Sequence, residues 1–479
     1  MSELPRLTRH RAPANPGIVH IGPGAFFKAF NAVYTDDVLR QAGGDWGIIA
    51  VSLQSDRAAQ QLRPQGCAYT AVALGAEGRD ARVIEAICDV LVAAQDPRAV
   101  VDAMADPRIH IVSLTITEKG YCHLPSTGAL NLDLPDIKAD LSSPETPRTA
   151  PGFLVEALTR RRAAGVPPFT VLSCDNLPEN GATARRVLLD FAAARDPELA
   201  AWIASDVSFP STMVDRITPA TTSDDVARLG EDEGYFDPAC VVHEPFRQWV
   251  IEDNFSSGRP DWALAGAQFV ASVKAHELMK LRCLNGTHST LAYLGYLSGF
   301  ETVAETVAQD DFAMLCQRLW AEEILPTVPA PEGEDLELYT SALLDRYRNP
   351  AIQHRTWQVA MDGSQKLPQR LLQTISERLA AGAISQGLCL AVAGWMRYVS
   401  GTDEGGQHID VRDPLADRLR DAYAAGKTAS ERALLMISIE DVFPQPLRRD
   451  ARFVATVSQA LDRIERDGAR ASVAAFVNS

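Results

Sequence analysis

The chain has 479 residues, of which 46% are hydrophobic and 23% are charged, a composition typical of a globular protein with on the order of two or three domains. Its formal net charge of −16 opposes non-specific binding to nucleic acid or anionic lipid, because both require a basic protein surface. The sequence has no N-terminal apolar signal segment and no run of about eighteen apolar residues, so no membrane span is expected and a cytoplasmic location is the default.

The 8 cysteines are scattered along the chain without Cys-x-x-Cys pairs. This spacing indicates neither a disulfide framework nor a thiolate zinc site. We therefore expect reduced cysteines, most of them in the core, and no metal.

The first predicted unit is a strand, a glycine turn and a helix. The strand covers 17–21, the turn carries Gly22 and Gly24, and a helical pattern continues to residue 39. In a dinucleotide-binding fold such glycines permit a tight turn and the close approach of a pyrophosphate to the helix N-terminus. The third glycine of that motif is missing, so a tight turn without a ligand is the alternative.

A second strand at 47–52 follows at the distance expected for a dinucleotide fold and leads into a polar segment. In this segment Asp56, or Gln54 before it, can accept hydrogen bonds from the adenosine ribose, whereas Arg57 can face a 2′-phosphate. NAD is therefore favoured as cofactor and NADP is not excluded. The structural alternative for Asp56 is a helix N-cap.

Apolar, β-rich runs follow at 69–74, 110–116 and 169–174, with helical stretches between them. This alternation predicts a mostly parallel sheet that is covered on both faces. The last two runs end in polar residues at the edge where α/β folds bind ligands. Asn176 follows the last run and can hydrogen-bond a substrate oxygen, although such residues more often form turns and caps.

Two segments with notable charged residues lie beyond the last of these strands. Asp215 and Arg216 are flanked by apolar residues, a pattern usual for an ion pair that fixes a connection. Arg247 lies among large apolar groups, where a buried guanidinium needs a carboxylate, and Glu244 and Asp253 are near in sequence.

From about residue 275 the strand signals fade, so we expect an α/β domain over 1–275 and an all-α domain over 276–479. A polar loop is expected at 362–368. The predicted helices cover 184–204 and 222–230 in the first domain and 303–326, 335–348, 369–382, 385–399, 412–425, 429–440 and 450–475 in the second.

The segment 276–300 is predicted to be a leucine-rich helix that carries chemistry. Lys280, Asn285 and His288 interrupt its apolar stripe, and each buried polar group without a partner costs roughly 1 to 3 kcal/mol. Hydride transfer leaves negative charge on a substrate oxygen, which requires hydrogen-bond donors and a group that moves a proton. Lys280 fits that role if burial lowers its pKa from about 10.4 toward neutrality, and a lysine that extends to the surface is the structural alternative.

Several long motifs resemble those of the long-chain, metal-independent polyol and sugar-acid dehydrogenases, the family that includes mannitol 2-dehydrogenase and fructuronate reductase. The resemblance covers nearly the whole chain and looks closer to the fructuronate reductase branch over 244–262 and 360–369. The motifs are TITEKGY at 115–121, SCDNLPENG at 173–181, MVDRI at 213–217, EPFRQWVIED at 244–253, Lys280-x4-Asn285-x2-His288 and DGSQK at 362–366.

The resemblance implies a Rossmann-type N-terminal domain, an α-helical C-terminal domain and an active site between them. It further implies a small sugar acid or polyol as substrate, interconverted between its keto and alcohol forms, and a monomer is compatible with the family. D-fructuronate and D-mannonate are the expected pair, and mannitol or another polyol is the alternative. An alternative of another class is a non-catalytic dinucleotide-binding module.

The site residues expected from the motifs fall into four groups. The resemblance implies a catalytic set of Lys280 as general acid/base with Asn176, Asn285 and His288. It also implies Asp215 and Lys366 as substrate ligands and Glu277 as a proton relay. The residues expected to contact the cofactor are Gly22, Gly24, Phe26, Phe27, Asp56, Thr115, Glu118 and Lys119.

A uronate differs from a polyol in carrying a carboxylate, which a fixed guanidinium binds in a bidentate manner. Arg247 is the first candidate for this contact and Lys366 the second. The family turn usually reads Phe-His-Arg-Ala-His, but here it is Phe26-Phe27-Lys28-Ala29-Phe30. A lysine in place of the arginine fork is expected to affect cofactor binding or cofactor preference.

Overall fold

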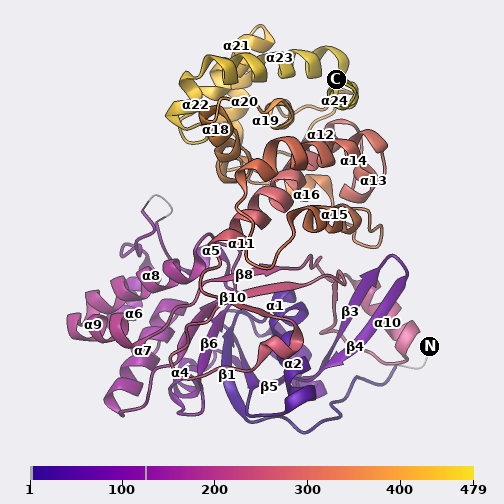
Figure 1. Ribbon diagram of the computed structural model, residues 1–479. Coiled ribbons are helices and arrows are strands. Elements are labelled where there is room, and N and C mark those ends of the chain that lie inside the picture. Colours follow the sequence, from indigo (N-terminus) through magenta and orange to yellow (C-terminus); the bar gives the residue numbers. More distant parts are fainter. Residues whose placement is uncertain (1–3, 125–126) are drawn as a thin grey trace. The chain divides into compact units, whose positions relative to one another are not determined.

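The computed structural model describes residues 4–124 and 127–479, and the chain divides into two compact units, Met1–Lys274 and Ala275–Ser479 (Figure 1). The first unit is built on a 5-stranded sheet with the order β5-β2-β1-β6-β7, in which every neighbouring pair is parallel. The strands are β1 (Pro16–Ile21), β2 (Gly47–Ser52), β5 (Ile87–Val92), β6 (Ile111–Leu114) and β7 (Thr170–Ser173).

The central strand β1 shows that both faces of this sheet are covered. Side chains alternate between the faces of a strand, and Ile18 enters one hydrophobic core whereas Val19 and Ile21 enter the other. The first core contains side chains of α1 (Ala25–Ala29) and α2 (Asn31–Ala42), and the second those of α4 (Pro97–Ala105), α7 (Ala150–Ala163) and α8 (Asn180–Arg195). The α/β fold with a parallel sheet predicted from the sequence is confirmed.

The strand order also places the ligand crevice. The chain adds β2 and β5 on one side of β1 and then β6 and β7 on the other. In such sheets ligands bind outside the carboxyl ends of the strands at this change of side, which here falls at the ends of β1 and β6.

Two smaller sheets complete the first unit. The run expected at 69–74 forms β3 (Tyr69–Gly75), but it lies in a separate sheet of order β4-β3-β9, where it pairs antiparallel with β4 (Gly78–Ile84) and parallel with β9 (Val241–His243). The other sheet has the order β11-β10-β8, with β8 (Thr212–Asp215), β10 (Gln248–Glu252) and β11 (Gln268–Val270).

The helix expected at 184–204 is in fact two helices, α8 and α9 (Pro197–Asp206). Asp196 ends the first and caps the second by accepting a hydrogen bond from the Glu198 N–H, and Pro197 stands in the first turn, where its missing N–H has no consequence. The unit also contains α3 (Arg57–Leu62), α5 (Thr117–Gly120), α6 (Pro135–Ser142), α10 (Ser223–Glu233) and two short 3-10 helices, η1 (Arg63–Gln65) and η2 (Trp262–Ala265).

The second unit contains helices and no strand, a statement that covers all of 275–479. The prediction of a loop at 362–368 is wrong, because α17 (Gly363–Leu367) forms there and continues into a π-helical segment, η6 (Pro368–Leu372). The other helices include α11 (Lys274–Met279), η3 (Lys280–Gly286, π-helical), α12 (Thr287–Leu297), α13 (Val303–Val307), α14 (Asp310–Arg318), η4 (Leu319–Ile324, π-helical), α15 (Leu336–Tyr347), α16 (Thr356–Ala360), α18 (Gln373–Ala380), α19 (Gln386–Tyr398), α20 (Ala416–Ala425), α21 (Ala429–Ile437), α22 (Gln445–Arg449), α23 (Ala451–Asp467) and α24 (Ala469–Val477).

One hydrophobic core holds this unit together, and α12 contributes Leu291 and Leu294 to it. Trp395 of α19 and Leu461 of α23 pack in the same cluster. Among the helices that the structure describes, none is long and apolar enough to cross a membrane.

Candidate active site

The glycine turn after β1 is held by the neighbouring strands. The Gly22 N–H donates to the Val51 carbonyl at 3.0 Å, and the Thr115 hydroxyl donates to the Gly22 carbonyl at 2.7 Å. Gly22 has φ 95°, and a Cβ there would stand 2.1 Å from the Thr115 carbonyl oxygen. Gly24 has φ −77°, and the nearest atom to a Cβ built on it would lie 3.9 Å away. The protein therefore has room for a side-chain methyl group at Gly24 but not at Gly22.

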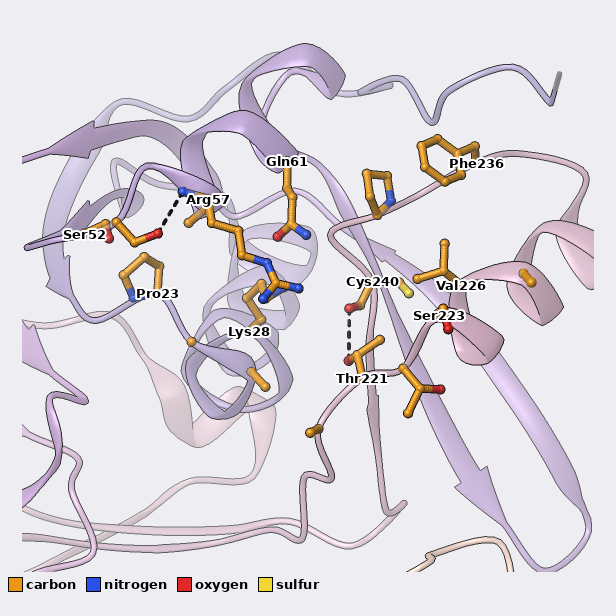
Figure 2. Close-up of a pocket in the computed structure, with 18 of the residues that line it drawn as sticks. Pro23, Lys28, Ser52, Arg57, Gln61, Thr221, Ser223, Val226, Phe236 and Cys240 are labelled. Atoms are coloured by element: carbon orange, nitrogen blue, oxygen red, sulfur yellow. Dashed lines mark hydrogen bonds between the residues drawn. The ribbon is translucent and has the colours of Figure 1, made fainter.

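A pocket of about 950 Å³ lies over this turn at the carboxyl ends of β1, β2 and β6. Figure 2 shows the Arg57 side chain extending from α3 into the pocket, with Lys28 of α1 below it. The opposite wall is formed by 220–240, which the sequence did not indicate. The residues that line it include Gly22, Pro23, Gly24, Lys28, Ser52, Ser55, Arg57, Gln61, Thr115, Thr221, Thr222, Ser223, Val226, Phe236 and Cys240, and none of the lining residues within 4–124 and 127–479 is a carboxylate.

Lys28 connects the two walls of the pocket. Its Nζ donates a hydrogen bond of 2.7 Å to the Ala239 carbonyl, and it lies 5.7 Å from the centroid of the Tyr69 ring. Burial lowers the pKa of Lys28 to about 8. A positive group that is poorly hydrated in this place suits a phosphate-bearing ligand.

Of the expected cofactor residues, Gly22, Gly24 and Thr115 line the pocket and the others do not. Phe27 is fully buried beneath the turn with its ring 3.7 Å from that of His20, and Phe26 stacks on Phe30. The carboxylate of Asp56 stands at the start of α3 and accepts a hydrogen bond of 2.8 Å from the Gln60 side chain. Glu118 and Lys119 are exposed on α5.

The buried carboxylate of Asp175 organises the segment after β6, a role that was not predicted from the sequence. It accepts hydrogen bonds from the N–H groups of Ile116 at 3.1 Å and Thr117 at 2.8 Å and from the Tyr121 hydroxyl at 2.8 Å. Thr117 has φ 62°, so these bonds hold a backbone conformation that a threonine rarely adopts. Asn176, the next residue, is exposed at the bend after β7.

Two further predicted residues of the first unit are partly or fully buried. Asp215 is the last residue of β8 and is 4% exposed. Arg247 forms an ion pair of 2.7 Å with Asp37 of α2 and lies over the Tyr34 ring at 4.3 Å. The partners that the sequence suggested for Arg247, Glu244 and Asp253, are not the ones it uses.

The motif of the second unit lies on a widened helical turn. Lys280, Asn285 and His288 are 8%, 9% and 6% exposed, so the expected burial is observed. In an α-helix residues five apart point about 140° away from each other, whereas the i→i+5 bonding of a π-helix brings them to one face. The π-helical segment η3 therefore aligns Lys280 with Asn285, a geometry that the α-helix expected from the sequence would not give.

His288 begins the α-helical continuation in an environment of positive groups. Its ring centroid is 4.6 Å from that of His354 and 5.4 Å from that of Tyr347. Burial, with His354 and Arg370 as the next causes, lowers the pKa of His288 well below its usual value, so the imidazole is neutral at pH 7. Its Nε2 atom is buried without a hydrogen-bond partner in the described part of the chain.

Lys366 and Glu277 complete the predicted set. Lys366 of α17 donates to the carbonyls of Val359 and Met361, and burial followed by the nearby Arg370 lowers its pKa to about 8. Glu277 is half-buried on α11, about one turn before Lys280. Within 4–124 and 127–479 no group of three or more His, Cys, Asp or Glu side chains is arranged to hold a metal ion.

The parallel sheet, its glycine turn and the pocket at the strand ends define a Rossmann-type dinucleotide-binding protein. Residues 16–264 match the family model of the mannitol dehydrogenase Rossmann domain, and residues 272–465 match that of the mannitol dehydrogenase C-terminal domain. The chain belongs to the mannitol dehydrogenase family, as its motifs indicated. It is an oxidoreductase that acts on CH–OH groups and uses a dinucleotide cofactor.

Relatives of both substrate types are similar to this chain. It is 47% identical over 463 residues to D-mannonate oxidoreductase of Escherichia coli, covering 96% of this chain and 95% of the relative. It is 41% identical to mannitol 2-dehydrogenase of Phaeosphaeria nodorum, covering 98% of this chain and 83% of the relative. Polyol or sugar-acid dehydrogenation is therefore the activity class.

Two solved structures share the fold over nearly the whole chain. Mannitol 2-dehydrogenase of Pseudomonas fluorescens, in a ternary complex with NAD and D-mannitol, is 38% identical with a TM-score of 0.86, covering 100% of this chain and 98% of that one. Substrate-free D-sorbitol dehydrogenase is 35% identical with a TM-score of 0.90, covering 96% of this chain and 95% of that one.

Proposed function

We propose that the enzyme interconverts D-fructuronate and D-mannonate with NAD(H) as cofactor. The observation that carries this choice of substrate is the 47% identity to a D-mannonate oxidoreductase across 96% of the chain. A sugar acid also suits the positive groups around His288, because the carboxylate that distinguishes it from a polyol needs a cationic partner.

The residues of the first unit fit a dinucleotide. The turn at Gly22 and Gly24 would hold its pyrophosphate, and Lys28 and Arg57 would face its phosphates or adenosine ribose. When bound, the nicotinamide ring supplies or accepts the hydride. NAD is supported by the complex of the Pseudomonas fluorescens relative, whereas Arg57 in the pocket leaves NADP as the competing cofactor to be tested.

The chain's own residues then supply the proton and the hydrogen bonds. In the reductive direction Lys280 delivers a proton to the substrate oxygen, and it removes that proton in the oxidative direction. Asn285, aligned with Lys280 by η3, donates an amide hydrogen bond to the same oxygen as negative charge develops on it. The neutral His288 donates from one ring nitrogen and accepts at the other, a capacity that suits substrate hydroxyls.

Four further residues remain proposed parts of this site. Asn176 is proposed as a second amide donor, Asp215 and Lys366 as substrate ligands, and Glu277 as the group that passes the proton between Lys280 and solvent. We further propose that the enzyme acts as a monomer, which size-exclusion chromatography with light scattering tests directly.

A substrate panel tests the proposal. Purified enzyme is mixed with NADH and, separately, with D-fructuronate, D-tagaturonate, D-fructose or D-xylulose, and the loss of NADH absorbance is followed. The highest kcat/KM is expected for fructuronate. A higher value for fructose would make the enzyme a mannitol 2-dehydrogenase, and NADH binding without turnover of any substrate would leave a binding module. Repeating the panel with NADPH decides the cofactor.

A further inference from the structure

The second unit contains a half-buried arginine to which the proposed proton transfer gives no role. Arg370 lies in η6, which crosses η3 so closely that a Cβ on Gly286 would stand 3.0 Å from the Arg370 carbonyl oxygen. Its Nη1 donates a hydrogen bond of 3.1 Å to the hydroxyl of Ser289, the residue after His288. The guanidinium is therefore directed at the start of α12, beside the motif.

Arg370 has no carboxylate at ion-pair distance among the described residues. Arg282 of η3 provides a contrast, because it is buried and forms two charge-assisted hydrogen bonds, 2.6 Å and 2.5 Å long, with Glu377. Burial lowers the pKa of Arg370, and the groups that act against this are the phenols of Tyr293 and Tyr347. A half-buried guanidinium without a counter-ion is incompletely compensated, and the carboxylate of a ligand can supply the missing charge.

The neighbours of Arg370 do not supply a counter-ion within the described residues. Lys366 lies close enough for Arg370 to lower its pKa, and it donates hydrogen bonds to the main-chain carbonyls of Val359 and Met361. His288 Nε2, His354 Nδ1 and the Tyr293 hydroxyl are buried without hydrogen-bond partners in the described parts of the chain. Asp362 and Asp413 raise the pKa of Lys366, but neither forms an ion pair with it within the described residues.

We propose that Arg370, assisted by Lys366, binds the carboxylate of the substrate and thereby selects sugar acids over neutral polyols. The inference rests on the proposed function and deepens it. A guanidinium offers two parallel N–H donors that match a carboxylate, which a hydroxyl group cannot use in the same way.

The spacing along the helix agrees with this assignment. From Asn285, the proposed donor to the reacting oxygen, to Ser289, which holds Arg370, four residues of helix span about 6 Å at a rise of about 1.5 Å per residue. This is comparable to the carbon chain that separates the keto carbon from the carboxyl group in a hexuronate. Arg247, the candidate expected from the sequence, is already paired with Asp37.

The test compares the charged and neutral substrates in four variants. Arg370→Gln is expected to raise KM for fructuronate by about thirtyfold or more, and to change KM for fructose by less than about threefold. Arg370→Lys keeps a charge and should recover part of the loss. Arg348→Gln, which removes an exposed arginine paired with the exposed Asp345, is the matched control and should change neither value. Arg247→Gln measures the rival candidate.

Each outcome has one meaning. A fall in activity that is equal for both substrates in Arg370→Gln, or a selective loss in Arg247→Gln alone, overturns the role of Arg370. If Arg370→Gln fails to fold, as a thermal melt will reveal, Arg370→Lys takes its place in the test. A larger change in KM for fructuronate than for fructose then supports the role of Arg370, and equal changes overturn it. Wild-type enzyme that binds NADH and reduces neither substrate refutes the proposed function instead.

Discussion

The Thr115 hydroxyl donates a hydrogen bond of 2.7 Å to the Gly22 carbonyl oxygen, which joins the end of β6 to the turn after β1. The same two residues leave no room for a side chain at Gly22, since a Cβ would stand 2.1 Å from the Thr115 carbonyl oxygen. The shape of the turn beneath the cofactor pocket therefore depends on the absence of one methyl group.

The two glycines of this turn are expected to respond differently to alanine. Gly22→Ala should lower the free energy of unfolding of the cofactor-free protein by roughly 2 to 4 kcal/mol, because φ is 95° and the Cβ clashes. Gly24→Ala should leave it within about 0.5 kcal/mol and raise Kd for NADH by about tenfold, because the cofactor approaches the backbone there. Urea unfolding and fluorescence titration measure the two quantities, and equal destabilisation by both changes would contradict this account.

Lys28 is expected to make cofactor binding depend on pH. Lys28→Met should raise Kd for NADH at pH 7 about tenfold, about 1.4 kcal/mol, because the cation beside the pocket is lost. The folded pKa of about 8 lies below the ordinary 10.5, so without cofactor the charged form is disfavoured by folding and stability rises as the pH increases from 8 to 10.5. Calorimetric titrations with NADH and thermal melts across this pH range measure the two effects. Lys28→Met should lose both the tighter NADH binding and the rise in stability, whereas Lys138→Met, which changes an exposed lysine, should keep both.

The proton-transfer role of Lys280 predicts a large loss of turnover with little loss of fold. Lys280→Ala should lower kcat by about 10² to 10⁴ and abolish the limb of the pH–rate profile that reports this group. Stopped-flow measurements at saturating NADH and substrate determine both. Lys427→Ala, at an exposed position, should change kcat less than about twofold, and a residual rate above a tenth of wild type in Lys280→Ala would assign proton transfer elsewhere.

Glu323 gives the second unit a pH-dependent stability. Its buried carboxylate accepts hydrogen bonds from the N–H groups of Gly387 at 2.7 Å and Leu388 at 2.8 Å, and burial raises its pKa from 4.5 to about 7. The folded state thus holds the proton more tightly, and its stability falls as the pH rises from 4.5 to 7, by at most roughly 3 kcal/mol. Denaturant unfolding at pH 5 and pH 8 should show this fall in wild type and in Glu322→Gln, an exposed neighbour, but not in Glu323→Gln.

Local patterns predicted much of the fold. The strand at 47–52 was placed to the residue, because an apolar run bounded by glycine and polar residues has few other structures. By contrast, β8, β9 and β10 were not predicted, because Asp215, Glu244 and Arg247 at their ends interrupt the apolar pattern. The run at 69–74 was identified as a strand, but its assignment to another sheet depends on pairing with distant segments.

The site was harder to predict from the sequence, because its contacts also join segments that lie far apart in the chain. Partners such as Asp37 for Arg247 or Ala239 for Lys28 lie far away along the chain, so no spacing rule indicates them. The far wall of the pocket at 220–240 belongs to a segment whose own composition is that of an ordinary surface helix. A π-helical turn has the same apolar pattern as an α-helix, so the alignment of Lys280 with Asn285 became visible only in three dimensions.

The widened turn at Lys280–Gly286 also determines what a change in length would do at this place in the chain. A π-helical turn holds about one residue more than an α-helical turn, so five residues in it cover about the same rotation as four in an α-helix. Deleting one residue between Lys280 and Asn285 would therefore restore ordinary α-helical bonding and still leave the lysine and the asparagine on one face. What this segment must preserve is the face that these side chains share, and more than one chain length can provide it.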